Sequence, residues 1–493
     1  MDNLAKIKEI QKQMNAINTV IEDLLTSEMK QQNHSQIDIQ RIEQLGKQVP
    51  FQSHFVSFLD EDVAVKYCTL LASAVRLLED TEKKIRQYYF IARILHSRKV
   101  RCSLEEIITN AELVGISDFT FMKQELGEDS KVFLFDLLLQ ISFEGKIEEK
   151  QLDYFCEVFA YDSVSEKDIK SIFKAVSCVL LENMEELLED DSNFPVEKIF
   201  YYFKDVDIVT SVEEIFKAKK ENLIIVGIKE FETISSKERL VETKTENGVS
   251  VNVEKIKYSF HVNTLKKRNI VFLKCAFKNI DSMDGIGMKI TFKNCDFHEC
   301  GFLSFAETVI NQCYFKKCGN TKNIMLKIKA GKIMNCKFEE CSVTDIKEQS
   351  ITSKKLCVEE GALIYLGKGV IAHCEYEKCR VIRKKEVRSN GLFNMSSMSW
   401  MIHYSSVDKS DKSAFVQTLN LIYSKNGIIE CCRFFECQCE DLEENRIENK
   451  YKYSDIKTYN FLINLVEGTE KNNIFERCVA PAKIGTARWE SEA

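Results

Sequence analysis

The sequence predicts an α + β multidomain protein, with an all-α helical bundle in its N-terminal half and a parallel β-helix solenoid in its C-terminal half. The solenoid is indicated by a six-residue phrase, Cys-x-aromatic-x-x-Cys, which occurs seven times after residue 270, with one cysteine replaced in the first and last copies. The first four copies start 20, 18 and 23 residues apart, a spacing typical of solenoid repeats. The bundle is indicated by apolar residues at helical spacing between residues 56 and 190.

One copy of the phrase with its flanks shows how a repeat folds. Pairs of apolar residues alternate with polar ones, and the parity changes between pairs: Ile290 and Phe292, then Cys295 and Phe297, then Cys300 and Phe302. Each change of parity needs a corner that absorbs one extra residue. Asn294 stands at the first corner, and Asn tolerates left-handed backbone. One repeat is therefore three short strands joined by two bends, and repeats stacked about 4.8 Å apart build a parallel β-helix.

Residues 261–480 resemble the right-handed parallel β-helix superfamily, with turns similar to those of pentapeptide-repeat proteins. In pentapeptide repeats a small residue stands two positions before each central Phe or Leu, as Cys295 stands before Phe297. The irregular spacing departs from ungapped pentapeptide arrays and favours a general β-helix. The last four copies start 38, 58 and 41 residues apart, which fits either two, three and two coils or single coils with long insertions.

Length and composition limit the class of protein. A chain of 493 residues predicts two or three domains. The net charge of -7 provides no bulk basic field for nucleic acid. Apolar runs are too short for a membrane span, and the first residues have no apolar signal core. These features predict a cytoplasmic protein without a membrane span.

The cysteines are interpreted as a reduced structural ladder. Fifteen of the nineteen lie between Cys275 and Cys478, most at inward positions where they act as small buried apolar side chains. A disulfide framework conflicts with the odd number and the missing signal core. Zinc is disfavoured because the Cys-x-x-Cys spacing does not occur. The most metal-like group is Cys431, Cys432, Cys437 and Cys439, but we predict no metal and no cofactor.

The first 55 residues are predicted to form a coiled-coil or amphipathic helix followed by a linker. Apolar residues repeat with the 3-4 spacing of a coiled-coil seam, at Ile7, Ile10, Met14, Ile17, Ile21 and Leu24. Isoleucine on both seam positions favours trimers or tetramers, which predicts a homo-oligomer. The alternative is a single helix that packs on its own domain.

Residues 56–190 resemble the TerB-like helical domain, first known from bacterial tellurite-resistance proteins. The family motif is matched by Glu144-Gly145-x-Ile147-Glu148, although Gln151 stands where a Glu is usual. The first half of the bundle has Glu79, Asp80 and Glu82 without the glycine. The resemblance implies that such acids can hold a divalent metal, whereas these departures favour solvated loop acids. The stretch from Ser163 to Glu166 predicts a capped helix start.

Two segments complete the domain plan. Residues 191–260 are predicted to connect the halves and to cap the first coil, because the end of a β-helix exposes unpaired strand groups and apolar side chains. Residues 481–493 form a tail that is too short to be a domain.

No catalytic residues are predicted. Outward acids and the histidines His298 and His373 have the pattern of a solvated face, and no phosphate loop or His-Glu-x-x-His motif occurs. The best candidate for a partner-binding surface is the insertion 389–426, with Phe393, Met395, Met398, Trp400, Met401 and Tyr404. The alternative is two extra coils with these residues turned inward.

The predicted function is a non-enzymatic cytoplasmic interaction or scaffold protein that binds protein partners through the β-helix. The TerB-like resemblance implies a context in bacterial stress or phage defence. The alternatives are a β-helix carbohydrate-active enzyme, which needs paired carboxylates, and a nucleic-acid binder or DNA mimic. Nucleic acid is disfavoured as a partner because basic runs such as Lys266–Arg268 are short.

Overall fold

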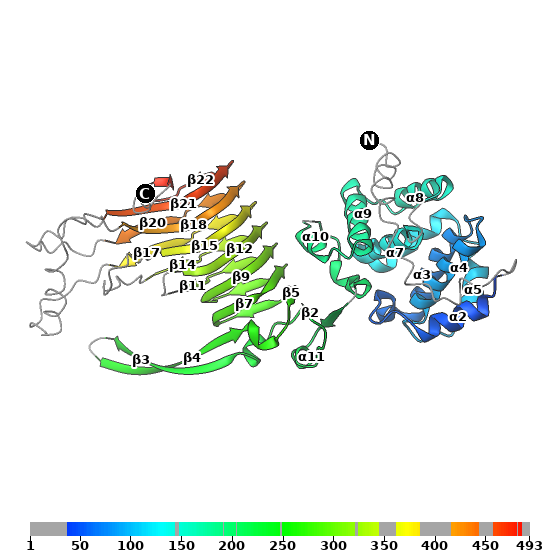
Figure 1. Ribbon diagram of the computed structural model, residues 1–493, viewed down its shortest axis with the longest axis horizontal. Helices are drawn as coiled ribbons and strands as arrows, with labels where there is room; N and C mark the ends of the chain where they lie inside the picture. The colour runs from blue at the N-terminus through cyan, green and yellow to red at the C-terminus, as the bar shows by residue number, and fades with distance from the viewer. Residues whose placement is uncertain are drawn as a thin grey trace, which may run out of the picture. The chain divides into compact units, whose positions relative to one another are not determined.

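The computed structural model describes residues 37–142, 147–190, 192–203, 205–246, 249–320, 324–344, 361–384, 416–442, 457–480 and 482–485. The chain divides into two compact units, Met1–Ile208 and Val209–Ala493. The first consists of helices and the second mainly of parallel strands, so the α + β class with N-terminal helices is confirmed (Figure 1).

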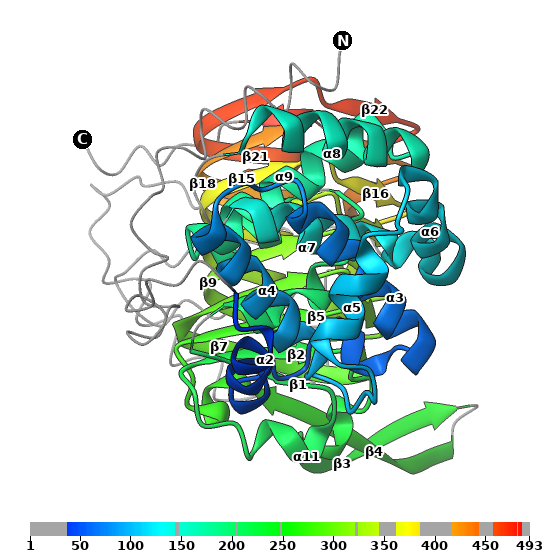
Figure 2. The ribbon, with the colours of Figure 1, turned by 90° about the vertical axis from the view of Figure 1, so that its right-hand side faces the viewer.

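The first unit is built from short helices joined by tight turns (Figures 1 and 2). They are α2 (Ile39–Gln48), η3 (Phe55–Phe58), α3 (Glu61–Val75), α4 (Thr81–Leu95), α5 (Leu104–Ala111), η4 (Ile116–Phe119), α6 (Thr120–Leu126), η5 (Gly127–Asp129), α7 (Ser130–Ser142), α8 (Glu149–Tyr161), α9 (Glu166–Leu180), α10 (Met184–Glu189), η6 (Val196–Lys198) and η7 (Phe200–Tyr202). Helix α7 is apolar on nearly all sides and packs against α3, α4, α6 and α9. Such a helix belongs in the core of a bundle.

The start of α9 differs from the prediction. The side chain of Ser165 caps the helix by accepting the N–H of Asp168, and Asp168 accepts the N–H of Ser165 in return. Ser163 instead lies in the turn before the helix with a left-handed φ of 53°. The predicted capping pair of Ser163 and Glu166 is therefore wrong by two residues, because an Asp completes the box as well as a Glu does.

The second unit contains three parallel sheets, named A, B and C. Sheet A runs in the order β1-β2-β5-β7-β9-β12-β15-β18-β21-β23, with β1 (Val206–Val209), β2 (Asn222–Val226), β5 (Asn269–Leu273), β7 (Ile280–Lys293), β9 (Phe302–Asn311), β12 (Ile324–Met334), β15 (Gly361–Ala372), β18 (Val416–Glu430), β21 (Lys457–Lys471) and β23 (Ala482–Gly485). Sheet B contains β6 (Ala276–Lys278), β8 (Asp296–His298), β10 (Tyr314–Lys316), β13 (Lys337–Glu339), β16 (Glu375–Glu377), β19 (Arg433–Phe435) and β22 (Ile474–Glu476). Sheet C contains β11 (Gly319–Asn320), β14 (Ser342–Val343), β17 (Arg380–Lys384) and β20 (Gln438–Leu442).

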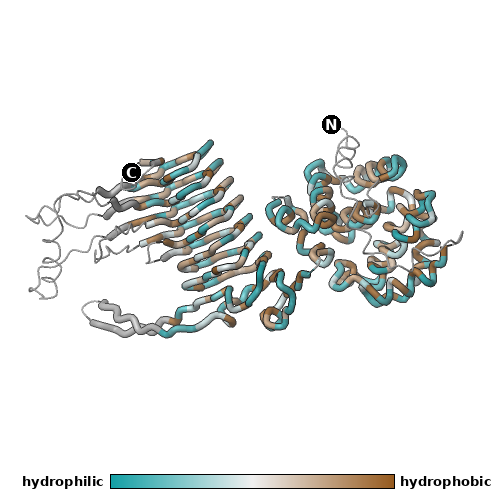
Figure 3. Tube along the Cα trace, viewed as in Figure 1, coloured by the Kyte–Doolittle hydropathy of each residue, from teal (hydrophilic) through white to brown (hydrophobic). Residues whose placement is uncertain are grey.

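From β9 to β21, successive strands along the chain visit the three sheets in turn, so β12, β13 and β14 form one repeat before β15 returns to sheet A. The two corners predicted for each phrase are present. In each copy of the phrase, a residue with left-handed backbone precedes the first position and another precedes the last position. In the second copy these residues are Asn294, with φ 54°, and Glu299, with φ 53°. The N–H of Asn294 donates to the Asn311 carbonyl of the next repeat at 3.0 Å, which holds the corner in place. Apolar and polar residues alternate along these strands (Figure 3).

The long spacings between the later phrases are insertions within single repeats. Phe338, Tyr376, Phe434 and Phe475 are direct neighbours in sheet B. The additional residues connect a strand of sheet C to the next strand of sheet A, in segments 344–360, 385–415 and 443–456. Because β15 pairs directly with β18, the alternative of two extra coils within 389–426 is wrong, as is that of two, three and two coils for the long spacings.

A glycine column that was not predicted runs across sheet A. Gly331, Gly369, Gly427 and Gly468 occupy one register position on β12, β15, β18 and β21. A Cβ atom on Gly369, whose φ is 142°, would lie 1.7 Å from the carbonyl oxygen of Gly331. The neighbouring strands approach so closely here that only glycine fits.

The predicted connector 191–260 contributes to both units. Its later part covers the first repeat, where the Phe231 ring of η8 (Phe231–Thr233) stacks on Phe277 at 4.4 Å and β2 pairs with β5. The long antiparallel hairpin of β3 (Ser236–Glu246) and β4 (Val249–His261) joins sheet A through the pairing of β4 with β7. Short helices α11 (Val212–Ile215) and η9 (Val262–Leu265) lie between strands.

Candidate functional site

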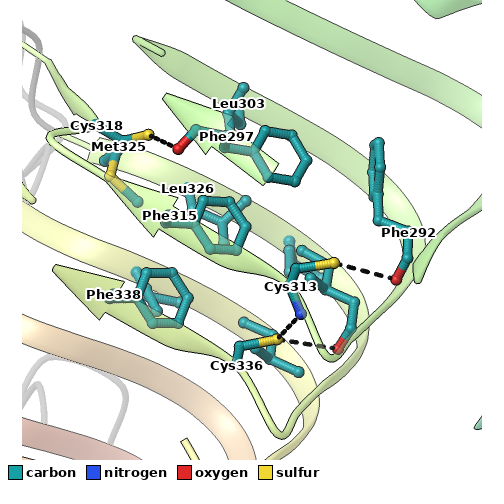
Figure 4. Packing of buried hydrophobic residues seen from close by; sticks show 14 of the residues in the cluster. Phe292, Phe297, Leu303, Cys313, Phe315, Cys318, Met325, Leu326, Cys336 and Phe338 are labelled. Atoms are coloured by element: carbon teal, nitrogen blue, oxygen red, sulfur yellow. Dashed lines mark hydrogen bonds between the residues drawn. The ribbon is translucent and has the colours of Figure 1, made fainter. Parts of the chain in front are cut away.

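The interior of the second unit is a column of stacked aromatic rings. Phe297, Phe315 and Phe338 lie one above another, with ring centroids 4.5 and 4.6 Å apart and planes within 8° of parallel (Figure 4). The column continues in both directions through Phe277, Tyr376, Phe434 and Phe475. Each ring stands at the centre of one phrase, so the sequence repeat and the packing repeat coincide. The column holds the outer faces of the sheets in fixed register.

Two columns of cysteines flank the rings. The Cys313 thiol donates to the Phe292 carbonyl of the preceding repeat at 3.5 Å, and Cys318 donates to the Phe297 carbonyl at 3.3 Å (Figure 4). Burial raises the pKa of the Cys295 and Cys313 thiols well above the ordinary value. A raised pKa makes these two thiols poor nucleophiles and metal ligands.

The group singled out as most metal-like is separated by the fold. Cys431 is exposed at a left-handed corner, whereas Cys432, Cys437 and Cys439 are buried in the interior. The cysteines of the described ranges are all free thiols. Within the same ranges, no three His, Cys, Asp or Glu side chains converge as a metal site would require.

The thiols provide a direct test of the ladder. We expect denatured protein, alkylated without reductant, to gain nineteen labels, one for each cysteine. In the native protein a fast reaction with a thiol reagent should be lost in Cys431→Ser and retained in Cys313→Ser, because Cys431 is exposed and Cys313 is buried. Mass spectrometry measures both results. Bound zinc, or a mass deficit equal to several disulfides, would contradict the ladder.

Two of the acids that carry the TerB-like resemblance, Glu79 and Glu148, are paired with lysines. The α3–α4 turn meets the start of α8, and two ion pairs cross between them: Glu79 with Lys150 at 3.0 Å and Glu148 with Lys83 at 2.9 Å. Asp80 caps α4 by accepting the N–H groups of Glu82 and Lys83. Glu144 and Gly145 lie outside the described residues.

A buried polar cluster in the first unit was not predicted from the sequence. Asp136 of α7 is fully buried and accepts the hydroxyl groups of Tyr67 at 2.5 Å and Tyr202 at 2.8 Å. The Nδ1 atom of His54 accepts the N–H of Val56 at 3.0 Å, so the ring proton lies on Nε2, 3.2 Å from Oδ2 of Asp136. This cluster of His54, Tyr67, Asp136 and Tyr202, which we name the polar node, joins η3, α3, α7 and η7.

The node contains acid–base residue types but is enclosed. His54 and Asp136 are both 0% exposed. Burial, together with the charge of Asp136, raises the pKa of Tyr67 and Tyr202 well above the ordinary value, so both remain hydrogen-bond donors. The node therefore stabilises the bundle and offers no access for a substrate. A charged residue inside the apolar stretch of α7, Val132 to Ile141, was the sequence signal that could have revealed it.

The outer face of sheet B carries charges of both signs in pairs. Lys316 contacts Glu339 at 3.1 Å, and Lys337 contacts Glu377 at 3.1 Å. The hydrogen bond from Tyr314 and the charge of Lys316 lower the pKa of Glu339 to about 2. His373 occupies a left-handed corner, and His298 lies at the end of β8. Paired charges of this kind are typical of a solvated face.

The outer face of sheet A differs, because lysines there surround a tyrosine pair. The Tyr365 and Tyr423 rings stack at 5.4 Å. The ammonium groups of Lys327 and Lys425 lie 5.6 and 6.0 Å from the Tyr365 ring centre. Cation–π contacts of this kind hold long side chains in place. This face is the best candidate for an interaction surface within the described residues.

The two predicted interaction sites lie outside the described residues and stay predictions. They are the seam of Ile7, Ile10, Met14, Ile17, Ile21 and Leu24, and the insertion residues Phe393, Met395, Met398, Trp400, Met401 and Tyr404. Among the helices described, none has the length and apolarity that a membrane crossing requires.

The fold and its surfaces define a protein with a helical first unit and a repeat-built parallel-sheet second unit. Comparison with family models, curated proteins and solved structures finds no match. Function must therefore be inferred from the residues themselves.

Proposed function

We propose that this chain is a non-enzymatic cytoplasmic interaction protein, in which sheets A, B and C form a right-handed parallel β-helix solenoid that binds a protein partner along its side. The solenoid is supported by the order in which the chain visits the sheets: each described repeat contributes a strand to sheets A and B, and the repeats between β9 and β21 also contribute one to sheet C. The cytoplasmic setting is supported by the free thiols, because oxidising compartments favour disulfides.

The ring column is the observation that carries this proposal. Stacked aromatic side chains at one position of every repeat make the outer faces extended and rigid, and solenoids bind partners through such faces. Two carboxylates of the described residues are occupied otherwise. The carboxylate of Asp136 is enclosed with its tyrosines, and that of Glu339 is paired with Lys316.

The remaining parts of the proposal concern the N-terminal half. We propose a TerB-like bundle, which carries over by analogy a context in bacterial stress or phage defence. The support is the meeting of the two acid-bearing turns through Glu79 with Lys150 and Glu148 with Lys83. The helix within residues 1–30 is proposed to join copies of the chain, on the strength of its seam alone.

Partner binding is tested by affinity purification from the native host followed by mass spectrometry. Replacing residues 389–415, the part of the predicted insertion that precedes β18, with a short Gly-Ser linker should reduce recovery of the partner, because aromatic and methionine side chains are favoured at interfaces. The matched control replaces residues 443–456, which also connect sheet C to sheet A. Circular dichroism should show a folded bundle in both variants.

The same purified protein should hydrolyse neither polysaccharide nor nucleotide. Turnover that persists through rigorous purification, and that is lost in a single substitution of an outward acid such as Glu375→Gln, would replace the interaction role with an enzymatic one.

A further inference from the structure

Three neighbouring strands of sheet A carry five lysines and a single carboxylate. From Ile324 to Met334, Gly361 to Ala372 and Val416 to Glu430, the only acid in the sequence is Glu430, the last residue of β18. The sequence contains five lysines there, which we name the lysine face: Lys327, Lys329, Lys332, Lys368 and Lys425. Lys329, Lys368 and Lys425 are exposed, and the other two are half-buried.

The register of the strands gathers these lysines around Tyr365. Lys327 lies directly opposite Tyr365 on the neighbouring strand, and Tyr365 lies opposite Tyr423 on the next. The ammonium groups of Lys327 and Lys425 both lie over the Tyr365 ring. Because contact with the ring restricts these side chains, less conformational entropy is lost when they bind a ligand.

The charge of this face contrasts with the rest of the second unit. Sheet B pairs its charges, as in Lys316 with Glu339 and Lys337 with Glu377. Acids return on the strands that border the lysine face, at Glu307 of β9 and Glu467 of β21. A positive patch confined to three strands, in a chain of net charge -7, provides local attraction for an anion.

We infer that the lysine face binds an acidic segment, rich in Asp and Glu, of the partner protein. This inference rests on the proposed function and specifies its partner. Single-stranded nucleic acid is less well matched, because such ligands stack successive bases on several aromatic side chains. Here Tyr423 is 3% exposed, so Tyr365 is the accessible ring of the pair.

The probe is a fluorescein-labelled peptide of about twelve residues with alternating Glu and Gly, and fluorescence anisotropy with the full chain measures its binding. The triple variant Lys329→Glu, Lys368→Glu and Lys425→Glu should bind at least about tenfold more weakly, because three attractive charges become repulsive. The control variant Lys229→Glu, Lys278→Glu and Lys317→Glu makes the same change of net charge at exposed lysines elsewhere in the second unit. It should bind within about twofold of the wild type.

A second pair of variants tests whether peptide binding depends on the Tyr365 ring that contacts the lysines or on the lysine charges alone. Tyr365→Phe keeps the ring and should leave binding unchanged. Tyr365→Ala removes the ring beneath Lys327 and Lys425 and should weaken binding by about two- to fivefold. Equal binding by both variants would overturn the role of the ring.

Two results would overturn the acidic-segment assignment. One is equal loss of peptide binding in both triple variants, and the other is tighter binding of a twelve-residue oligo-dT than of the peptide. Failure of the proposed function gives a different result from these two. In that case the wild-type chain still binds the acidic peptide, but affinity purification from the host recovers no partner. If a partner is recovered, the triple variant should lose it while the control variant keeps it.

Discussion

Replacing Phe315 with Asp should abolish soluble expression of the chain. The Phe315 ring is 0% exposed and stacks between Phe297 and Phe338 at 4.5 and 4.6 Å. An aspartate in this position buries a carboxylate among aromatic rings and thiols without a cation to pair with it, which is far more costly than the loss of packing alone. Phe315→Ala should be tolerated better, with a loss of about 3–5 kcal/mol in the free energy of unfolding.

The matched control is Phe435, which also lies in a phrase repeat but faces outward on β19 next to Arg477. Phe435→Asp should leave expression intact, and Phe435→Ala should change the free energy of unfolding only slightly. Denaturant titration followed by far-ultraviolet circular dichroism gives both values. If Phe315→Asp melts like the wild type, then the assignment of the ring column to the interior is wrong.

The repeat could be predicted because its phrase encodes both spacing and parity. Cys295 and Phe297 point inward only if a corner separates them from Phe292, and the structure places left-handed backbone there at Asn294. At the second corner the same conformation is adopted by Glu299, a residue type that does not favour it. The hydrogen bond from its N–H to Lys316 of the next repeat supplies the constraint. Local sequence cannot indicate a bond of that kind.

Features that depend on contacts between distant segments escaped prediction. The glycine column is scattered over Gly331, Gly369, Gly427 and Gly468, and only the register of sheet A aligns it. The insertions could not be assigned to one side of the repeat until the strands on either side were paired. The lysine face was overlooked for a different reason. Its lysines form no basic run in the sequence, because Lys327, Lys368 and Lys425 come together only across three paired strands.

The polar node of the first unit depends on four separate segments in the same way. His54, Tyr67, Asp136 and Tyr202 come from η3, α3, α7 and η7, and no spacing in the sequence relates them. The TerB-like motif drew attention to acids in turns, whereas the buried carboxylate lies in the middle of the core helix. Asp136 therefore provides a test of the bundle that does not depend on the family resemblance.

Asp136→Ala should destabilise the first unit by about 3–5 kcal/mol. The substitution leaves the hydroxyl groups of Tyr67 and Tyr202 and the Nε2–H of His54 without their shared acceptor. His54 and Tyr67 are fully buried, and Tyr202 is half-buried. Each stranded buried donor costs about 1–3 kcal/mol, so the loss exceeds that of an ordinary core hydrogen bond. Asp136→Asn should also destabilise, because the amide replaces one acceptor oxygen with a donor that faces another donor.

Thermal and denaturant unfolding of the full chain, monitored at helical wavelengths, measures this loss. The control is Asp153→Ala, which removes an exposed carboxylate from α8 and should change the free energy of unfolding by less than about 0.5 kcal/mol. A double-mutant cycle of Asp136→Asn with Tyr202→Phe isolates one bond of the node. The double variant should lose less than the sum of the single losses, because removal of the Tyr202 hydroxyl also removes a stranded donor. Strictly additive losses would show that Tyr202 and Asp136 do not interact, and the node would have to be redrawn around Tyr67 and His54.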